Sequence, residues 1–497
     1  MKNILIVGAS EEFLSNAVLE QVFENIKVNQ VTLLVHHKEQ AKQFERFGKC
    51  YFREDVAQGR YEDDMLDMQN SIPLDDVVFD YMAPYVLEIL NQQRRFEEYH
   101  AFQISDTLEN HRIIYMRNLF FWFNLLEREK ITHVFFSCLP HEGYDHIIYH
   151  LAKMKNISIR MIYNSTLPRR YYELTDYLHP EKELGEVYHK LQEDYRDTKD
   201  IPLSQEEEKI YQKWSTLEPA KMKPWYMEGD PLKRRFEIRF GTTNIWSAVY
   251  QEIGNVYVKY NYRFCAKFVF DCIRNIPKFL KVMFKTAARW IRTRGVWIRT
   301  KQLNQFYDEL AQMPIEGERY IYFALHYQPE ASSNPLGGYY FDQLLAVNLL
   351  ARSVGEDTKI YVKVHPEQLA PLRSKDYYTD MVKIPNVRLI KTKCDTYGLI
   401  RNAEAVSSLT GTVCWEAQFF GIPAILFGHS HKNLAPLSYA VRTYEECCDA
   451  VKEIREHKKT VSEKELRIFV KAMYEQSFAG EDKDIMLPQI LGAFLAN

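Results

Sequence analysis

The sequence predicts an α/β protein with two doubly wound, Rossmann-like domains that face a cleft, and with a helical region that bridges them. Three observations support this fold class. The 497 residues exceed the roughly 100–200 residues of one ordinary domain. Short β-branched runs alternate with helix-length segments near both ends of the chain, and this alternation stops in the middle. A hydrophobic content of 46% is enough to fill two cores and argues against disorder.

The first predicted domain covers residues 1–167. Its candidate strands are the runs NILIVGA, VTLLVHH, THVFFSC and ISIRMIYN, and its clearest helix is NLFFWFNLLERE. Strands that alternate with helices in this way form a parallel sheet covered on both faces.

The predicted bridging region covers residues 168–314, where charged and aromatic segments such as KELGEVYHKLQEDYRD and SQEEEKIYQKWSTL predict helices. The second Rossmann-like domain is predicted over 315–497. Its five candidate strands are YIYFALH, KIYVKVHP, NVRLIKTK, EAVSSLTG and PAILFGHS, and residues 444–497 are predicted to close the domain with helices.

Composition excludes several classes of protein. The net charge of −3 gives no general attraction to nucleic acid, so we expect no nucleic-acid partner. Eight cysteines without a C-x-x-C pair indicate reduced thiols rather than a zinc site. No apolar run reaches the roughly 18–20 residues of a membrane span, and the N-terminal run is too short for a signal peptide. The expected location is the cytoplasm.

The segment SSLTGTVCWEAQFFGIPAILFG predicts a phosphate site. A strand runs into Thr410-Gly411-Thr412, and a helix then begins near Val413 and ends at Gly421. Hydroxyls and backbone N–H groups at a helix start attract phosphate, although an ordinary Thr cap would look the same. Glu416, one turn into this helix, is placed to reach a ribose hydroxyl or only to favour the helix dipole.

Two further strand ends carry candidate donor-binding residues, because ligands of open α/β sheets bind at the carboxyl ends of strands. Lys363 and His365 in YVKVHPEQ fall on one face of a strand end, where they would neutralise a phosphate; a locally satisfied His is the alternative. After the strand that begins at Ile321 come Gln328, Glu330 and Ser332, which either face the donor or form a plain polar loop.

The acceptor side is predicted at THVFFSCLPHEGYDH, where His141, Glu142 and Asp145 follow a strand at the start of a helix. One of them would act as general base on an acceptor hydroxyl, or the acids would only favour the helix dipole. His141 and His146 are five residues apart and cannot share a metal, and His146 with His150 lacks a third ligand. We therefore predict neither metal nor cofactor.

Residues 272–307 contain nine Lys or Arg and no acid. If 278–291 is helical, Leu280, Phe284, Ala287 and Ile291 form an apolar stripe with cations around it. This pattern suits an anionic membrane surface. A helix that bridges domains with solvated charges is the alternative.

The segments LHYQPEASSNPLGGYYFDQLLAVNLLA, YVKVHPEQ, IPNVRLIK and SSLTGTVCWEAQFFGIPAILFG together resemble the capsule polysaccharide biosynthesis family, which includes bacterial transferases of the sugar acid Kdo. The resemblance covers about 320–429 and is fainter at PHEGYDHIIYHLAK. It implies a GT-B glycosyltransferase whose C-terminal half holds a nucleotide sugar, such as CMP-Kdo.

The resemblance also implies roles for residues. His365-Pro366 matches the His-Pro motif at the donor phosphate, and Ser408 with Thr410–Thr412 matches the hydroxyl motif beside it. The acidic D/E-D/E-G motif reads His141-Glu142-Gly143 here, which keeps one acid of two and leaves the catalytic residue open among His141, Glu142 and Asp145.

The predicted function is therefore a metal-independent glycosyltransferase of capsule or surface polysaccharide synthesis. It would act on a glycan or lipid-linked oligosaccharide acceptor and bind peripherally to the inner face of the cytoplasmic membrane. A CDP-polyol phosphotransferase of teichoic-acid-like synthesis, or a non-catalytic capsule-complex subunit, are the alternatives.

Overall fold

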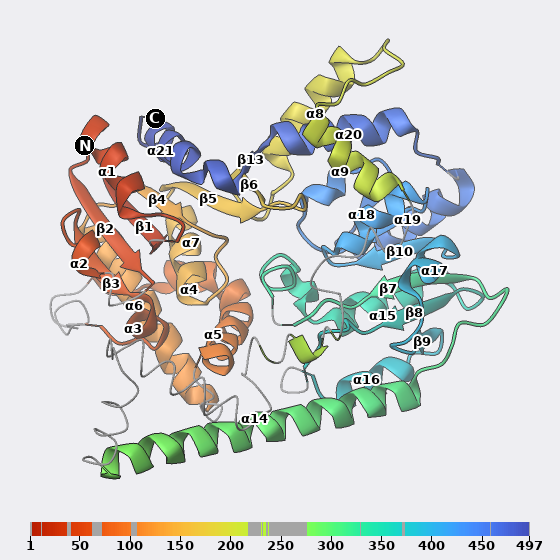
Figure 1. The fold of residues 1–497 in the computed structure, drawn as a ribbon, viewed down its shortest axis with the longest axis horizontal. Coiled ribbons are helices and arrows are strands. Elements are labelled where there is room, and N and C mark those ends of the chain that lie inside the picture. The colour runs from red at the N-terminus through yellow and green to blue at the C-terminus, as the bar shows by residue number, and fades with distance from the viewer. Residues whose placement is uncertain are drawn as a thin grey trace. The chain divides into compact units, whose positions relative to one another are not determined.

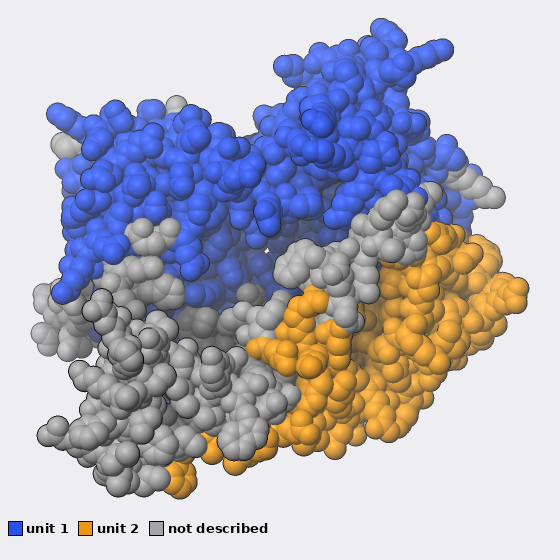
Figure 2. All heavy atoms as spheres, viewed as in Figure 1, with its two compact units in different colours: residues 1–217, 329–343, 407–497 blue, residues 218–328, 344–406 orange. Residues whose placement is uncertain are grey.

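The protein is described by a computed structural model (Figure 1). The described residues are 2–10, 12–36, 41–61, 72–100, 107–216, 230, 232–234, 237, 276–328, 330–369, 373–457 and 459–496. They pack as two compact units, one of residues 1–217, 329–343 and 407–497, the other of 218–328 and 344–406 (Figure 2). The domains predicted over 1–167, 168–314 and 315–497 remain a prediction.

The α/β class with two mainly parallel sheets is confirmed. The first sheet has the strand order β13-β6-β5-β4-β1-β2-β3, and the second has β12-β11-β10-β7-β8-β9. Counted from the first strand of each, both contain the 3-2-1-4-5 order of a Rossmann sheet. The first-sheet strands are β1 (Asn3–Ala9), β2 (Gln30–Val35), β3 (Lys49–Phe52), β4 (His133–Phe136), β5 (Ser158–Asn164), β6 (Arg170–Leu174) and β13 (Ser477–Ala479).

The second sheet contains all five strands that the sequence predicts for it. β7, β8 and β9 pair in parallel, as do β11 and β12. Its strands are β7 (Tyr320–Ala324), β8 (Lys359–Lys363), β9 (Val387–Leu389), β10 (Ala405–Ser408), β11 (Ala424–Leu426) and β12 (Ser438–Ala440).

Helices cover the sheets. Those of the N-terminal part are α1 (Asn16–Asn25), α2 (Ala41–Phe44), α3 (Arg53–Ala57), α4 (Asp76–Met82), η3 (Ala83–Tyr85), α5 (Val86–His100), α6 (Leu108–Arg128) and α7 (Tyr144–Met154). Those of the middle are α8 (Lys182–Asp194), α9 (Gln205–Ser215) and α14 (Ile276–Leu310). The later ones are η5 (Gly338–Phe341), α15 (Gln343–Val354), α16 (Lys375–Val382), α17 (Thr396–Arg401), α18 (Thr412–Phe419), η7 (His431–Leu434), α19 (Tyr444–His457), α20 (Glu463–Glu475), η8 (Gly480–Asp482) and α21 (Lys483–Ala496).

Two elements differ from the sequence-based expectation. β6, in the stretch predicted to be helical, pairs antiparallel with β5. β13, within the predicted helical closure, pairs antiparallel with β6. Both strands carry Tyr or Phe whose rings bury against the first sheet, so tertiary packing overrides the charged, helix-like composition around them.

The last helix completes the core of the first sheet. Leu487, Leu491 and Phe494 of α21 are buried in one cluster with Ile4 and Leu33 of β1 and β2. Figure 1 shows α21, in blue, beside α1, in red. The N-terminal sheet is thus closed by residues from the far end of the chain.

Candidate functional site

The three predicted acceptor-side residues lie at the edge of the first sheet where Rossmann folds bind ligands. The switch point of a Rossmann sheet lies between its first and fourth strands in this numbering, here β1 and β4, which pair in parallel. The turn that follows β4 carries His141, Glu142 and, at the first turn of α7, Asp145. The structure therefore brings the three predicted catalytic candidates together at one sheet edge.

Asp145 closes this turn. Its Oδ2 accepts a hydrogen bond from His141 N at 2.8 Å, and its Oδ1 accepts from Glu142 N at 2.7 Å and from His146 N at 2.8 Å. Burial and the charge of Glu142 raise the pKa of Asp145 to about 7. Gly143, the N-cap of α7, has a φ of 90° and no side chain to cap the helix, so the Asp145 carboxyl orders these N–H groups instead.

Glu142 is held by an ion pair. Arg53 Nε donates to Glu142 Oε2 at 2.6 Å, Arg53 Nη2 donates to Oε1, and the Tyr144 hydroxyl donates to Oε2 at 2.7 Å. Burial alone would raise the pKa of Glu142, but the charge and hydrogen bonds of Arg53 outweigh it and lower the pKa to about 2. A carboxylate bound in this way is a weak base.

His141 has the orientation of a general base. Its Nδ1 lies 2.5 Å from the Leu139 carbonyl, which can only accept, so Nδ1 carries the proton. The basic lone pair is then on Nε2. A base oriented by a backbone carbonyl on its other nitrogen is the usual arrangement for proton transfer by histidine.

The donor-side corner lies at the end of β10. Thr410 does not cap α18; its hydroxyl donates to Ser332 O at 2.7 Å, and the N-cap is Gly411, which has no side-chain hydrogen bond. Thr412 is exposed at the first position of the helix. The N-cap residue of α18 is thus a glycine without a side-chain cap, and backbone N–H groups at a helix start suit an anion.

Lys432 is a residue of this corner that the sequence did not reveal. Its side chain is buried, and its Nζ donates to Thr410 O at 3.0 Å. Burial lowers the pKa of Lys432 to about 8. Lys432 could not be identified from the sequence, because the segment HSHKN that contains it matches no binding motif. Its basic neighbours are the only signal in that segment.

Glu416 is buried on α18 with 6% of its surface exposed. Among the residues that the structure describes, its carboxyl has no hydrogen-bond partner. Burial raises its pKa to about 7, and the charge of Lys213 opposes the rise. A carboxyl without a protein partner can bind a ligand, and a ribose diol would supply suitable hydroxyls.

Ser408 is packed beneath the corner. It is buried, and a Cβ added at Gly411 would lie 2.8 Å from Ser408 Oγ, so a larger residue at 411 would force the Ser408 hydroxyl to move. The backbone of the TGT motif therefore lies directly against the Ser408 hydroxyl, as close packing at a phosphate-binding turn requires.

Lys363 of the other unit has local partners. Its Nζ donates to Cys394 O at 2.5 Å and to Thr396 Oγ1 at 2.9 Å, and burial lowers its pKa. Lys363 therefore holds the turn before α17, and its predicted phosphate contact remains a prediction.

His365 and Gln328 are ordered by residues of the same unit. His365 Nδ1 accepts from Glu367 N at 3.2 Å, which places the proton of the neutral ring on Nε2. Pro366 is exposed beside it. The Gln368 side chain binds both Gln328 N and Gln328 O, at 3.0 and 3.2 Å.

Glu330 and Ser332 belong to the loop 330–338. Ser332 Oγ donates to Glu330 Oε2 at 3.3 Å, and Ser333 N and Asn334 N donate to Glu330 O. The loop is attached to α5 by Gln92 Nε2, which donates to Asn334 Oδ1 at 2.7 Å. Gln92 has no motif around it, so sequence reasoning missed this contact.

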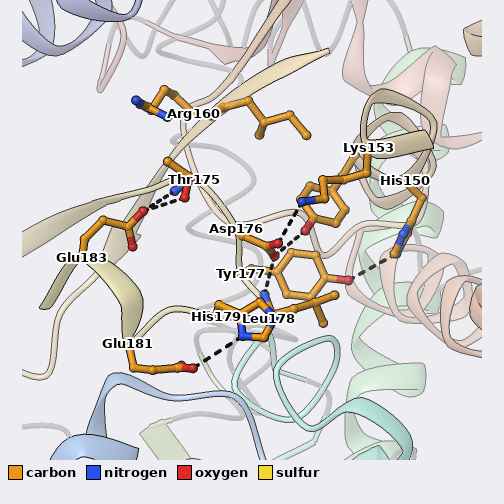
Figure 3. A network of polar contacts seen from close by, with 12 residues as sticks. His150, Lys153, Arg160, Thr175, Asp176, Tyr177, Leu178, His179, Glu181 and Glu183 are labelled. Atoms are coloured by element: carbon orange, nitrogen blue, oxygen red, sulfur yellow. Dashed lines mark hydrogen bonds and ion pairs between the residues drawn. The ribbon is translucent and has the colours of Figure 1, made fainter. Parts of the chain in front are cut away.

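A buried polar network supports the acceptor side, and Figure 3 shows its contact between Tyr177 and His150. His146 Nδ1 lies 3.1 Å from Gln92 Oε1, which also accepts from Gly143 N. The Tyr177 hydroxyl lies 2.5 Å from His146 Nε2 and 3.3 Å from His150 Nε2. Burial lowers the pKa of His146 to about 3, so this histidine is neutral. The two histidines bond each other at 2.8 Å.

Helix α14 covers residues 276–307 of the predicted basic patch, and residues 272–275 lie outside the described residues. Phe284, Ile291 and Ile298, spaced by seven, are 76%, 63% and 47% exposed. The opposite face is buried through Val296, Thr300, Leu303 and Tyr307. None of the described helices has the length and apolarity to cross a bilayer.

No family model matches this chain, and no curated protein matches it by sequence. Solved structures with a similar fold include the UDP-GlcNAc 2-epimerase of Methanocaldococcus jannaschii, at 11% identity and a TM-score of 0.25, with 99% of each chain covered.

Two further structures are of KpsC from Thermosulfurimonas dismutans. Its β-Kdo 2,4 transferase shows 10% identity and a TM-score of 0.29, with 69% of this chain and 79% of that chain covered. Its β-Kdo 2,7 transferase shows 11% identity and a TM-score of 0.28, with 78% and 97% covered. At these values the similarity decides nothing about activity.

Proposed function

We propose that the protein is a glycosyltransferase that moves a sugar from a nucleotide-activated donor to a glycan acceptor. The observation that carries the proposal is the start of α18: a glycine N-cap without a side chain and the buried cation of Lys432, which donates to Thr410 O. The buried carboxyl of Glu416 lies one turn further along the same helix. Together these groups suit a phosphate joined to a ribose.

The donor is proposed to be a CMP-sugar acid such as CMP-Kdo. Support comes from the resemblance of the His365-Pro366 and Ser408, Thr410–Thr412 motifs to those of Kdo transferases. In the proposal, Nε2–H of His365 donates to the leaving phosphate, and Gln328, Glu330, Ser332 and Lys363 complete the donor side. Charge stabilisation of this kind needs no divalent metal.

On the acceptor side we assign the base to His141. Glu142 is neutralised by Arg53, and both oxygens of Asp145 accept backbone N–H groups, whereas the hydrogen bond of His141 Nδ1 to the Leu139 carbonyl leaves Nε2 as the basic ring nitrogen. The acceptor oxygen attacks the anomeric carbon, its proton passes to His141 Nε2, and the bond from that carbon to the CMP phosphate breaks. One base is sufficient for such a single displacement.

The setting is proposed to be capsule or surface polysaccharide synthesis at the cytoplasmic membrane face. Helix α14 supports this, because its exposed apolar stripe is flanked by the exposed cations Arg294, Arg299 and Lys301. Interfacial helices combine these features to bind anionic lipid.

The experiment is a thermal-shift panel of CMP, CDP, UDP and GDP with the wild type and two variants, Lys432→Met and Glu416→Leu. A ligand at 100 times its Kd stabilises the folded protein by about 2.7 kcal/mol, which is easily measured. We expect CMP to raise Tm, and both variants to lose the rise. The matched control Glu109→Gln, exposed on α6, should keep it.

Absence of a shift with all four nucleotides would overturn the proposal. Transfer assays with CMP-Kdo and with a CDP-polyol as alternative donors separate it from phosphotransfer, since phosphorus enters the product only in the second reaction.

A further inference from the structure

Three polar groups near the candidate base have no partner. Glu88 Oε1 is buried without a hydrogen bond. Within the described part of the chain, the hydroxyls of the half-buried Tyr81 and Tyr85 make no hydrogen bond either. These residues come from α4, η3 and the first turn of α5, which are consecutive in the chain. A buried polar atom that stays unsatisfied, as Glu88 Oε1 does, indicates a missing ligand or water, and the two half-buried hydroxyls are able to bind the same ligand.

The groups gather at one place in the first unit. The Tyr81 and Tyr85 rings lie 6.1 Å apart, and the carboxyl of Glu88 and the hydroxyl of Tyr339 both act electrostatically on Tyr85. Tyr339, on η5, is 77% exposed. A carboxyl with three phenols offers several hydrogen-bonding groups and apolar ring faces at one position.

The side chain of Tyr85 in this cluster is held in place by packing against a buried polar network. The His150 ring stacks on Tyr85 at 3.5 Å, and the Tyr177 hydroxyl contacts His150. Asp176, before Tyr177, accepts hydrogen bonds from the Tyr149 hydroxyl, Lys153 Nζ and Leu178 N. Figure 3 shows the contacts of Asp176 with Lys153 and Leu178. Fixed side chains bind a ligand at a smaller entropic cost than mobile ones.

The loop and the candidate base are adjacent to the same helix. Asn334 Nδ2 donates to Glu88 O at 3.4 Å, so the loop 330–338 reaches the turn of α5 that carries Glu88. A Cβ added at Gly143 would lie 2.8 Å from Gln93 and 3.5 Å from Ile89 O. The turn that bears His141 is therefore packed against α5 one turn beyond Glu88.

We propose that Glu88, Tyr81, Tyr85 and Tyr339 form a subsite that binds the hydroxyl groups and one ring face of an acceptor sugar. The identification of that sugar as the acceptor rests on the proposed function; the binding of a sugar does not. Burial raises the pKa of Glu88 to about 8, so at neutral pH the carboxyl is protonated and can both donate to and accept from sugar hydroxyls.

The test is saturation-transfer NMR on the full chain with free Kdo and with lactose as probes. We expect signal from at least one probe, and a loss of fivefold or more in Glu88→Leu and in Tyr339→Ala. Tyr444→Ala, an exposed tyrosine elsewhere, and Glu109→Gln are the matched controls and should retain the signal. Each variant's Tm verifies that it is folded.

The outcomes are distinct. No signal from either probe, or equal signal in all variants, overturns the subsite. If CMP still raises Tm in that case, the proposed function survives alone. If CMP and the other nucleotides give no shift while Glu88→Leu abolishes sugar binding, the subsite stands and the transferase proposal fails.

Discussion

Gln92 and Asn334 are 242 residues apart in the chain, yet their buried side chains share a hydrogen bond of 2.7 Å. Gln92 also accepts from Gly143 N, so one amide side chain connects the loop 330–338 to the turn of the candidate base. The bond is between neutral groups, and its geometry does not depend on pH in the physiological range.

Asn334→Ala should therefore destabilise the protein by about 1–3 kcal/mol, because Gln92 Nε2 is left buried without an acceptor. Urea unfolding measures the loss. Asn402→Ala is the matched control, since that amide is exposed and bonds only within α17, to Gly398 O. Equal losses in both variants would contradict the role of the Gln92 contact.

Arg53→Met should cost about 3–5 kcal/mol, since it leaves the Glu142 carboxylate buried without its cation. The double variant Arg53→Met/Glu142→Leu should recover most of this loss. A double variant less stable than Arg53→Met would show that Glu142 contributes independently of Arg53.

The Arg53–Glu142 ion pair also predicts how the stability of the protein depends on pH. The pKa of Glu142 is about 2 in the folded protein and its ordinary value is 4.5. The folded state therefore holds the charged form more strongly, and this stabilisation is complete above pH 4.5 and is lost as pH falls from 4.5 towards 2. Urea midpoints at pH 5 and pH 3 should differ less in Glu142→Gln than in the wild type.

For Glu88, the change of stability with pH has the opposite sign. Its folded pKa of about 8 lies above the ordinary 4.5, so between these values the unfolded chain releases a proton that the folded protein keeps. Stability then falls as pH rises from 4.5 to 8. Glu88→Leu should raise stability by about 0.5–2 kcal/mol, most at pH 8 and above. A destabilised Glu88→Leu at pH 8 would show that the carboxyl is satisfied in the protein.

Ile291→Asp should weaken binding to vesicles of phosphatidylglycerol and phosphatidylcholine about tenfold or more, because burying an isoleucine is worth about 1.5–3 kcal/mol. Leu345→Asp on α15, equally charged and 50% exposed in the wild type, is the control. Sedimentation with vesicles at two salt concentrations measures both. Binding that Ile291→Asp leaves unchanged would remove α14 from the interface.

The sequence predicted the strands that carry strong apolar runs, such as β1 and β7, and the position of α18, because its Gly411 and Gly421 boundaries are local signals. It did not predict β6 and β13, whose pairing is non-local. The candidate residues His141 and Thr410 could be placed at strand ends by the periodicity, whereas their hydrogen bonds to Leu139 and Ser332 could not.

Site residues that lie outside any motif could not be predicted from the sequence, for a physical reason. Glu88, Gln92 and Lys432 acquire their character from burial, and burial depends on the fold rather than on neighbours in the sequence. A glutamate in a helix is ordinarily a solvated side chain.

The packing of α21 against β1 and β2 has a consequence for biosynthesis. Strands β1 and β2 are translated long before Leu487, Leu491 and Phe494, which complete their core. The apolar surface of β1 and β2 therefore stays exposed while more than four hundred further residues are synthesised. Ribosome-bound chains that stop before α21 should be captured by chaperones or cleaved by proteases, whereas chains that extend beyond it should be protected.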